Sequence, residues 1–217
     1  MNLGTFRPRY LVARVQQLIF ERQFPDAPWL TRSSIMLLDS WLRSTDVGFE
    51  WGSGRSTLWF ANRVSHFVSV ETSKEWFDKI TVRLKAGGLS EKVDYRYMEC
   101  DIDEREGPLS LPYADTILSF DDNHFDFVLV DGMARASCAR NALAKIKPGG
   151  LLIIDNANRY FPSVRMGKFT TVHEQRSSLL SPVWEEVSRP LHGWRAIHTS
   201  DGICDTRMWQ KPFTHNK

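Results

Sequence analysis

The sequence is poor in cysteine and carries little net charge. Its 217 residues include three cysteines, Cys100, Cys138 and Cys204, which form an odd and widely spaced set. Such a set excludes a disulfide framework and a Cys-x-x-Cys metal knuckle. The formal net charge is +2, and the basic residues are scattered along the chain. This pattern argues against a dedicated nucleic-acid-binding face.

Long apolar runs are also missing. Residues 1–10 contain no stretch long enough for the apolar region of a secretory signal. The longest apolar runs, such as residues 151–154, are far shorter than the roughly 20 residues that cross a membrane. We therefore expect a cytoplasmic, soluble protein without a membrane partner.

Two parts of the chain differ in pattern. The first, residues 1–45, contains apolar side chains at helical spacing, with Pro25 and Pro28 between the two helices that this spacing predicts, over 10–24 and 31–42. We interpret this part as an N-terminal helical extension that could cover an acceptor site. Residues 46–217 form the second part, in which short apolar segments alternate with longer amphipathic ones.

This alternation predicts an α/β domain. Strands are expected over 47–49, 66–70, 93–98, 125–130 and 151–154, and helices over 56–62, 74–86 and 134–146, with a loop and a short helix within 108–120. Two further strands, 194–199 and 203–210, flank Asp201–Gly202, a dipeptide typical of a hairpin turn. We therefore predict a doubly wound, mostly parallel seven-stranded sheet with helices on both faces and a C-terminal antiparallel hairpin.

A glycine-containing loop, residues 50–57, directly follows the first predicted strand. Gly52 and Gly54 allow backbone conformations and close approaches that other residues resist. The loop leads into a helix whose first N–H groups favour a negatively charged ligand group. The alternative interpretation is a tight strand-to-helix turn without a ligand.

Acidic residues follow several predicted strands. Glu71, Asp101 and Asp131 close the second, third and fourth strands, and Glu50 lies at the end of the first. Ligands of open α/β sheets bind at this edge, and a carboxylate about twenty residues beyond a glycine loop can accept hydrogen bonds from ribose hydroxyls. Each acid taken alone is equally consistent with a solvated loop carboxylate.

With these residues in place, the chain resembles class I S-adenosylmethionine-dependent methyltransferases, which have a Rossmann-like fold. The resemblance covers about residues 46–211. Its motifs are the glycine loop 50–57, the acid at the end of 70–71, the strand 125–131, the Pro-Gly-Gly turn and strand at 147–155, and the terminal hairpin. Ser56 departs from the family loop, which has a third glycine there.

The resemblance implies a role for each matching residue in binding S-adenosylmethionine. Glu50 would hold the methionine ammonium, Glu71 the ribose, and Asp131 would face the methionine or the acceptor, which makes it the catalytic candidate. The remaining cofactor-binding candidates are the loop residues Gly52, Ser53, Gly54, Ser56 and Thr57, with Thr72, Asp101 and Ile102 beside the adenine.

Asp131, Asp155 and Asn156 suggest a divalent cation. Two carboxylates and an amide oxygen suit Mg²⁺, and the set resembles the metal site of catechol and caffeoyl-CoA O-methyltransferases. The chain departs from those enzymes at Ala134, where they have a lysine. The alternative is that Asp155 and Asn156 cap a following helix.

Other polar and aromatic residues have weaker signals. Arg159, Arg165 and Lys168 could receive an acidic acceptor or belong to a solvated loop. Trp29 could be part of an acceptor lid. The histidines His173, His192 and His198 lack metal spacing and have no evident acidic partner along the sequence, so we interpret them as ordinary.

We therefore predict S-adenosylmethionine-dependent methyl transfer to a small-molecule acceptor, with a hydroxyl as the expected acceptor group. A nucleic-acid methyltransferase is an alternative, although residues 131–134 lack the Asp/Asn-Pro-Pro-Tyr pattern that grips an extruded base. A non-catalytic cofactor-binding protein and a nicotinamide-dependent oxidoreductase are further alternatives.

Overall fold

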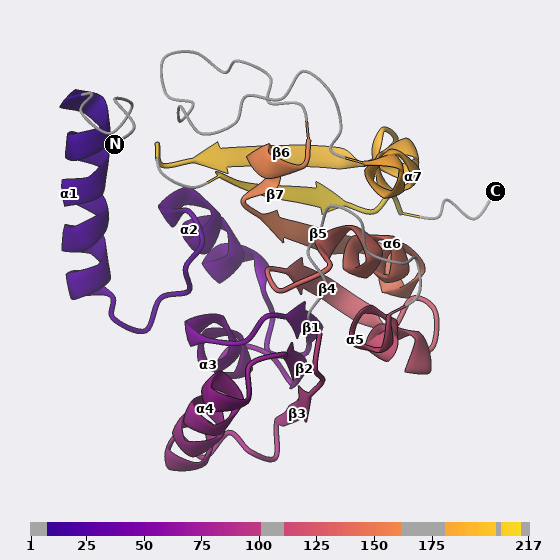
Figure 1. Cartoon of the computed structure of the whole chain (residues 1–217), viewed down its shortest axis with the longest axis horizontal. Helices are drawn as coiled ribbons and strands as arrows, with labels where there is room; N and C mark the ends of the chain where they lie inside the picture. The colour runs from indigo at the N-terminus through magenta and orange to yellow at the C-terminus, as the bar shows by residue number, and fades with distance from the viewer. Residues whose placement is uncertain (1–7, 101–110, 162–180, 203–204, 214–217) are drawn as a thin grey trace.

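The computed structural model describes residues 8–100, 111–161, 181–202 and 205–213. A seven-stranded sheet has the order β3-β2-β1-β4-β5-β7-β6 (Figure 1). The strands are β1 (Val47–Trp51), β2 (His66–Glu71), β3 (Val93–Tyr97), β4 (Phe125–Val130), β5 (Ile146–Asp155), β6 (Arg195–Ser200) and β7 (Asp205–Gln210). The first five run parallel, and β7 pairs antiparallel with both β5 and β6. This topology confirms the predicted fold class.

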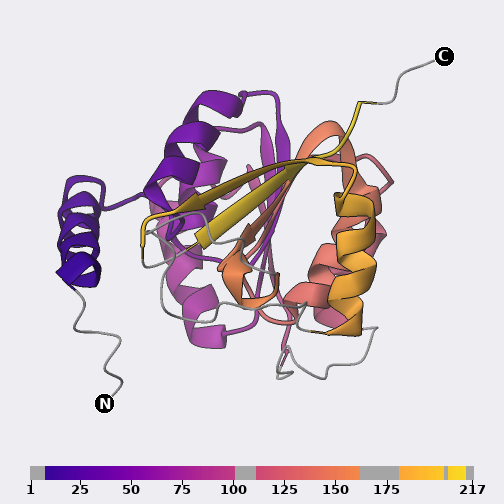
Figure 2. The same cartoon turned by 90° about the horizontal axis from the view of Figure 1, so that it is seen from above.

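Helices cover both faces of the sheet (Figure 2). The helices α2 (Arg32–Trp41), α3 (Arg55–Ala61) and α4 (Lys74–Ala86) lie on one side, and α5 (Pro112–Asp115), α6 (Arg135–Lys145) and α7 (Pro182–Leu191) on the other. Each face has its own apolar core, with Phe60, Phe67 and Phe127 in one and Trp51 and Trp184 in the other. The remaining helix, α1 (Pro8–Gln23), lies at the periphery in both views.

Two elements differ from the sequence prediction. The strand expected over 151–154 begins at Ile146, because the Pro-Gly-Gly segment is an irregularity within β5 and not a turn before it. Gly149 has a φ of +82° there, which glycine adopts without strain. The helix α7 was not predicted, although Pro182 suits the first turn of a helix and Pro190 lies in the last. Among the described helices, none has the length and apolar character that crossing a membrane requires.

Candidate functional site

Four acidic residues lie at one edge of the sheet. Glu50 and Glu71 are at the ends of β1 and β2, Asp155 ends β5, and Asp131 follows β4. Their strands run parallel, so all four carboxyl groups come to the carboxyl edge of the sheet, as the sequence predicts. Asp101 and Ile102, predicted to contact the adenine, lie outside the described residues, as do Arg165, Lys168 and His173.

Gly52 has a steric role at this edge. Its φ is +91°, and a Cβ atom added there would lie 2.7 Å from the backbone nitrogen of Gly132. A Cβ at Gly132 would likewise lie 2.9 Å from the nitrogen of Gly52 and 2.0 Å from the hydroxyl of Tyr113. The loops after β1 and β4 therefore touch backbone to backbone, which requires glycine on both sides.

The glycine loop folds onto the carboxylate of Glu71. The backbone nitrogen and hydroxyl of Ser53 donate to one carboxylate oxygen over 3.0 and 2.5 Å. The backbone nitrogens of Thr72 and Ser73 donate to the other oxygen, each over 2.8 Å. Because these donors use about four acceptor positions, a ribose at Glu71 would have to share or displace the Ser53 hydroxyl.

Two aromatic residues that sequence reasoning missed hold Ser53 in place. The indole nitrogen of Trp76 donates to the Ser53 carbonyl over 2.7 Å, and the Tyr95 hydroxyl lies 2.7 Å from the Ser53 hydroxyl. Trp76 is on α4 and Tyr95 on β3. Nothing in the sequence near either residue signals that its polar atom reaches the loop.

Glu50 is completely buried. One of its carboxyl oxygens accepts hydrogen bonds from the Thr57 hydroxyl and, over 2.7 Å, from the Ser69 hydroxyl. Within the described residues the other oxygen, Oε2, accepts no hydrogen bond of good geometry, although the Ser56 hydroxyl lies close enough to the carboxyl to lower its pKa. Burial raises the pKa of Glu50 to about 8, mainly because a charge there is poorly solvated.

Thr57 and Ser56 support the loop from the first turn of α3. The Thr57 hydroxyl lies between Glu50 and the backbone nitrogen of Gly54, which donates to it over 2.9 Å. Ser56 is buried in the same turn, with 7% of its surface exposed. The Thr57 hydroxyl bonds directly to Glu50, and the Ser56 hydroxyl lies close enough to lower the pKa of the Glu50 carboxyl, so both residues help to position it.

Arg135 organises the ends of β4 and β5. Its buried guanidinium donates to the Asp131 carboxylate over 2.9 Å and to the Asp131 carbonyl over 2.7 Å. It also donates to the carbonyl of Gly132 over 3.0 Å and to the carbonyl of Asp155 over 2.5 Å. The Arg135 guanidinium therefore links the ends of β4 and β5, which the magnesium hypothesis would link through a metal ion.

Asp131, Asp155 and Asn156 do not fit a Mg²⁺ site in this arrangement. One carboxylate oxygen of Asp155 accepts from the Thr206 hydroxyl over 2.8 Å, and the other accepts from the Asn156 amide nitrogen. Burial and the nearby charge of Asp131 raise the pKa of Asp155. The capping alternative lacks support too, because Asn156 makes no side-chain cap to the described turn that follows it.

His198 has an acidic partner that the sequence interpretation missed. Its Nε2 lies 3.6 Å from a carboxylate oxygen of Asp205, which is completely buried. Neither oxygen of Asp205 accepts a hydrogen bond from any residue that the structure describes. His198 pairs with Arg207 and Asp205 with Ser200, so the two residues lie diagonally across the terminal hairpin, two register positions apart. The predicted hairpin was the signal that could have paired them.

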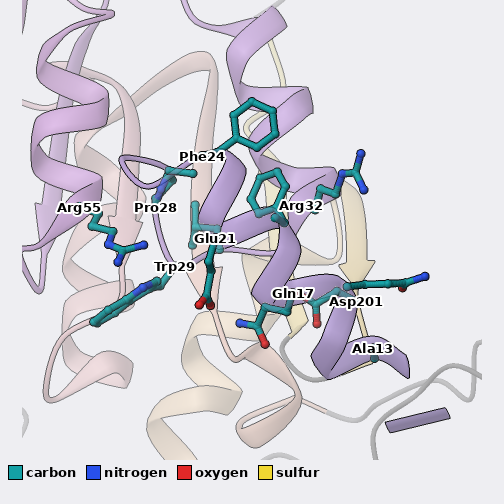
Figure 3. A pocket seen from close by; sticks show the side chains of 13 residues that line it. Ala13, Gln17, Glu21, Phe24, Pro28, Trp29, Arg32, Arg55 and Asp201 are labelled. Atoms are coloured by element: carbon teal, nitrogen blue, oxygen red, sulfur yellow. The ribbon is translucent and has the colours of Figure 1, made fainter. Parts of the chain in front are cut away.

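A pocket adjoins the glycine loop (Figure 3). Arg55, the residue after Gly54, and Trp29 line one side of it, Gln17 and Asp201 line the other, and the Glu21 side chain projects between them. The Arg55 guanidinium carbon lies 5.5 Å from the centre of the Trp29 ring, which is within the range of a cation–π contact. The Trp29 ring also stacks on Trp76, the residue that holds Ser53, at 6.3 Å between centroids.

No protein-family model matches the chain, and no curated protein matches it significantly. Its structure is similar to a candidate caffeoyl-CoA O-methyltransferase from Staphylococcus aureus, with a TM-score of 0.57, 17% identity, and coverage of 94% of this chain and 98% of that one. It is also similar to a precorrin 8W decarboxylase from Methanobacterium thermoautotrophicum, with a TM-score of 0.52, 19% identity, and coverage of 86% and 94%.

A third similar structure is the [4+2]-cyclase SpnF, with a TM-score of 0.50, 14% identity, and coverage of 84% of this chain and 81% of that one. The names of these three proteins indicate different reactions, so the similarity concerns the fold and not the chemistry. The chain has the fold of class I S-adenosylmethionine-dependent methyltransferases.

Proposed function

We propose that this protein binds S-adenosylmethionine at the ends of β1 and β2 and transfers its methyl group to a small-molecule acceptor. The observation that carries the proposal is the buried Glu50 carboxyl, whose Oε2 atom has no hydrogen-bond partner among the described residues. A buried polar atom without a partner is unfavourable. An ammonium group, such as that of the methionine part of the cofactor, satisfies it.

The other cofactor contacts follow in the same proposal. The backbone of Gly52, Ser53 and Gly54 packs against the methionine part, and Glu71 with Thr72 lies beside the ribose and adenine. Asp101 and Ile102 complete the adenine side. Asp131 faces the methionine, held by Arg135. An oxidoreductase that binds a nicotinamide cofactor has no use for a buried carboxyl such as Glu50 in front of the loop.

We further propose that the acceptor occupies the pocket beside Trp29 and Arg55, with residues 1–45 as its cover. Methyl transfer is an in-line displacement, in which the acceptor atom forms a bond to the methyl carbon as the bond from carbon to sulfur breaks. Alignment of the two reactants supplies much of the acceleration. A hydroxyl acceptor also loses its proton, to water or to a basic group beside it.

Magnesium has no part in this proposal, because the two carboxylate oxygens of Asp155 already accept hydrogen bonds from Thr206 and Asn156. A nucleic-acid acceptor is less well supported than a small molecule, since the pocket beside Trp29 is lined by Glu21 and Asp201 as well as by arginines. Phosphate groups are repelled by such carboxylates.

The test is calorimetry with S-adenosylhomocysteine. Since the pKa of Glu50 is about 8, its carboxyl group is protonated in the free protein at pH 7. The ammonium group of the ligand favours the ionised carboxylate, so binding should drive off the proton. Binding at pH 7 should release a proton, so the measured heat should depend on the ionisation enthalpy of the buffer. The affinity should rise by up to about tenfold from pH 6 to pH 7 and level off above about pH 8.

Glu50→Gln should abolish this proton release and weaken binding by at least about tenfold at pH 8. The matched control is Glu75→Gln, which changes an exposed residue of α4 and should keep both properties. Absence of binding at millimolar ligand would overturn the cofactor assignment, and binding of NAD in its place would favour the oxidoreductase. If binding holds, transfer of a labelled methyl group to a panel of hydroxylated small molecules tests the reaction.

A further inference from the structure

Two residues of opposite charge line the pocket beside Trp29. Arg55 is in the first turn of α3 and Glu21 is on α1, and both residues are partly buried. Within the described residues, neither makes a hydrogen bond or an ion pair, with each other or with a third residue. Because partial burial weakens the solvation of a charge, each of them would be stabilised by a ligand group of opposite charge.

The other two charged residues of the pocket are in a different situation. Arg32 is exposed to solvent, and Asp201 already has a partner of its own. Figure 3 shows the Glu21 side chain between the side of the pocket that carries Arg55 and Trp29 and the side that carries Asp201. Arg55 and Glu21 are therefore the two charges inside the pocket that remain open to a ligand.

The uncharged part of the pocket wall is mostly apolar and includes the aromatic rings of Phe20, Phe24 and Trp29. The segment that carries Trp29 is anchored to the sheet, because the backbone nitrogen of Thr31 donates to the Thr206 hydroxyl over 3.2 Å. Both threonines are completely buried. This wall is therefore a fixed surface against which an apolar part of a ligand, above all an aromatic ring, can pack.

We propose that the acceptor is an α-amino acid with an aromatic side chain, an inference that rests on the function proposed above for this pocket. The carboxylate of the amino acid pairs with Arg55, since the planar guanidinium can donate two parallel hydrogen bonds to a carboxylate. The ammonium group pairs with Glu21, and the side chain packs against the aromatic rings. A ligand with only one of these charges leaves the other pocket charge without a partner, so the two charges together set the specificity.

Calorimetry with three related probes tests this inference, with and without S-adenosylhomocysteine. L-phenylalanine has both charges, phenethylamine lacks the carboxylate, and 3-phenylpropanoate lacks the ammonium group. None of them has a hydroxyl that could be methylated, so the heats report recognition alone. Phenylalanine should bind at least about tenfold more tightly than either of the others. Equal affinities for the three probes, or no binding of phenylalanine at millimolar concentration, would overturn the inference.

Substitution of each charged residue should affect the probes selectively. Arg55→Gln should weaken phenylalanine binding at least about tenfold without changing the affinity for phenethylamine, which has no carboxylate. Glu21→Gln should weaken phenylalanine binding by a similar factor without changing the affinity for 3-phenylpropanoate. The matched control is Arg22→Gln, which removes a charge from an exposed residue of α1 and should leave all three affinities unchanged. Unchanged binding of phenylalanine in Arg55→Gln or Glu21→Gln contradicts the inference.

The fold of the two pocket variants is checked by thermal unfolding. Neither Arg55 nor Glu21 makes a hydrogen bond or an ion pair with a described residue, so both variants should unfold at the wild-type temperature. The outcomes also separate this inference from the proposed function. Binding of S-adenosylhomocysteine without binding of phenylalanine would leave the cofactor site in place and overturn the amino-acid acceptor. Binding of phenylalanine without S-adenosylhomocysteine would support the amino-acid site and overturn methyl transfer.

Discussion

The two halves of the carboxyl edge use their acidic residues differently. At the ends of β1 and β2, Glu50 keeps one buried oxygen without a partner among the described residues. At the ends of β4 and β5, the carboxylate of Asp131 is bonded to Arg135 and that of Asp155 to Thr206 and Asn156. Position at the end of a strand therefore does not make a carboxyl group a ligand site. The donors that surround it decide whether it is open to a ligand or closed by the protein.

The largest effect that separates the two halves should come from Arg135→Gln. This change leaves buried carbonyls of Gly132 and Asp155 and the Asp131 carboxylate with fewer donors, so the free energy of unfolding should fall by about 3 kcal/mol. Urea unfolding followed by circular dichroism measures it. The matched control is Arg83→Gln, whose ion pair with Asp26 is exposed on both sides and should contribute less than about 1 kcal/mol. Equal losses in both variants would show that Arg135 does not hold the strand ends together.

Glu71→Ala tests the other half of the carboxyl edge, at the ends of β1 and β2, where we expect the carboxyl groups to bind a ligand. Loss of a charged hydrogen-bond acceptor beside the ribose should weaken S-adenosylhomocysteine binding at least about tenfold by calorimetry. Because Glu71 also holds the glycine loop through Ser53, a second variant is needed. Ser53→Ala removes the hydroxyl that competes for Glu71 and should change the affinity less than about threefold. An unchanged affinity in Glu71→Ala would contradict the ribose assignment.

The smallest effect is expected from magnesium. Because the oxygens of Asp155 already accept hydrogen bonds from the protein, millimolar Mg²⁺ and its removal by EDTA should leave both the thermal midpoint and the affinity for S-adenosylhomocysteine unchanged. Differential scanning fluorimetry and calorimetry measure these quantities. A heat of magnesium binding that disappears in Asn156→Ala would restore the metal hypothesis. Both halves of the carboxyl edge would then be open to a ligand.

Much of the fold follows from local pattern. Strands β4 and β5 contain continuous apolar segments, 127–130 and 151–154, and the Asp201–Gly202 turn predicts the hairpin of β6 and β7. The helix α7 was missed because it contains two prolines, which in a sequence suggest a break even where one of them starts the helix. The irregular start of β5 was missed for a similar reason, since a Pro-Gly-Gly segment resembles a turn.

The candidate site was predictable in its positions but not in its contacts. The sequence places Glu50, Glu71, Asp131 and Asp155 at strand ends, and parallel pairing brings strand ends to one edge. It contains no signal that Arg135 would reach across to Asp155, or that Trp76 and Tyr95 would hold Ser53. These contacts join residues from different strands and helices, so their formation depends on the packed structure.

The sequence alone determined the alternation of strands and helices, the glycine loop and the edge at which the acids gather, because periodicity, turn chemistry and strand direction are local properties. The tertiary structure decided which carboxyl group is buried with an open oxygen, which are closed by neighbours, and which face of α1 meets solvent. Burial and hydrogen-bond satisfaction depend on side chains that are far apart in the chain, and only the folded packing brings them together.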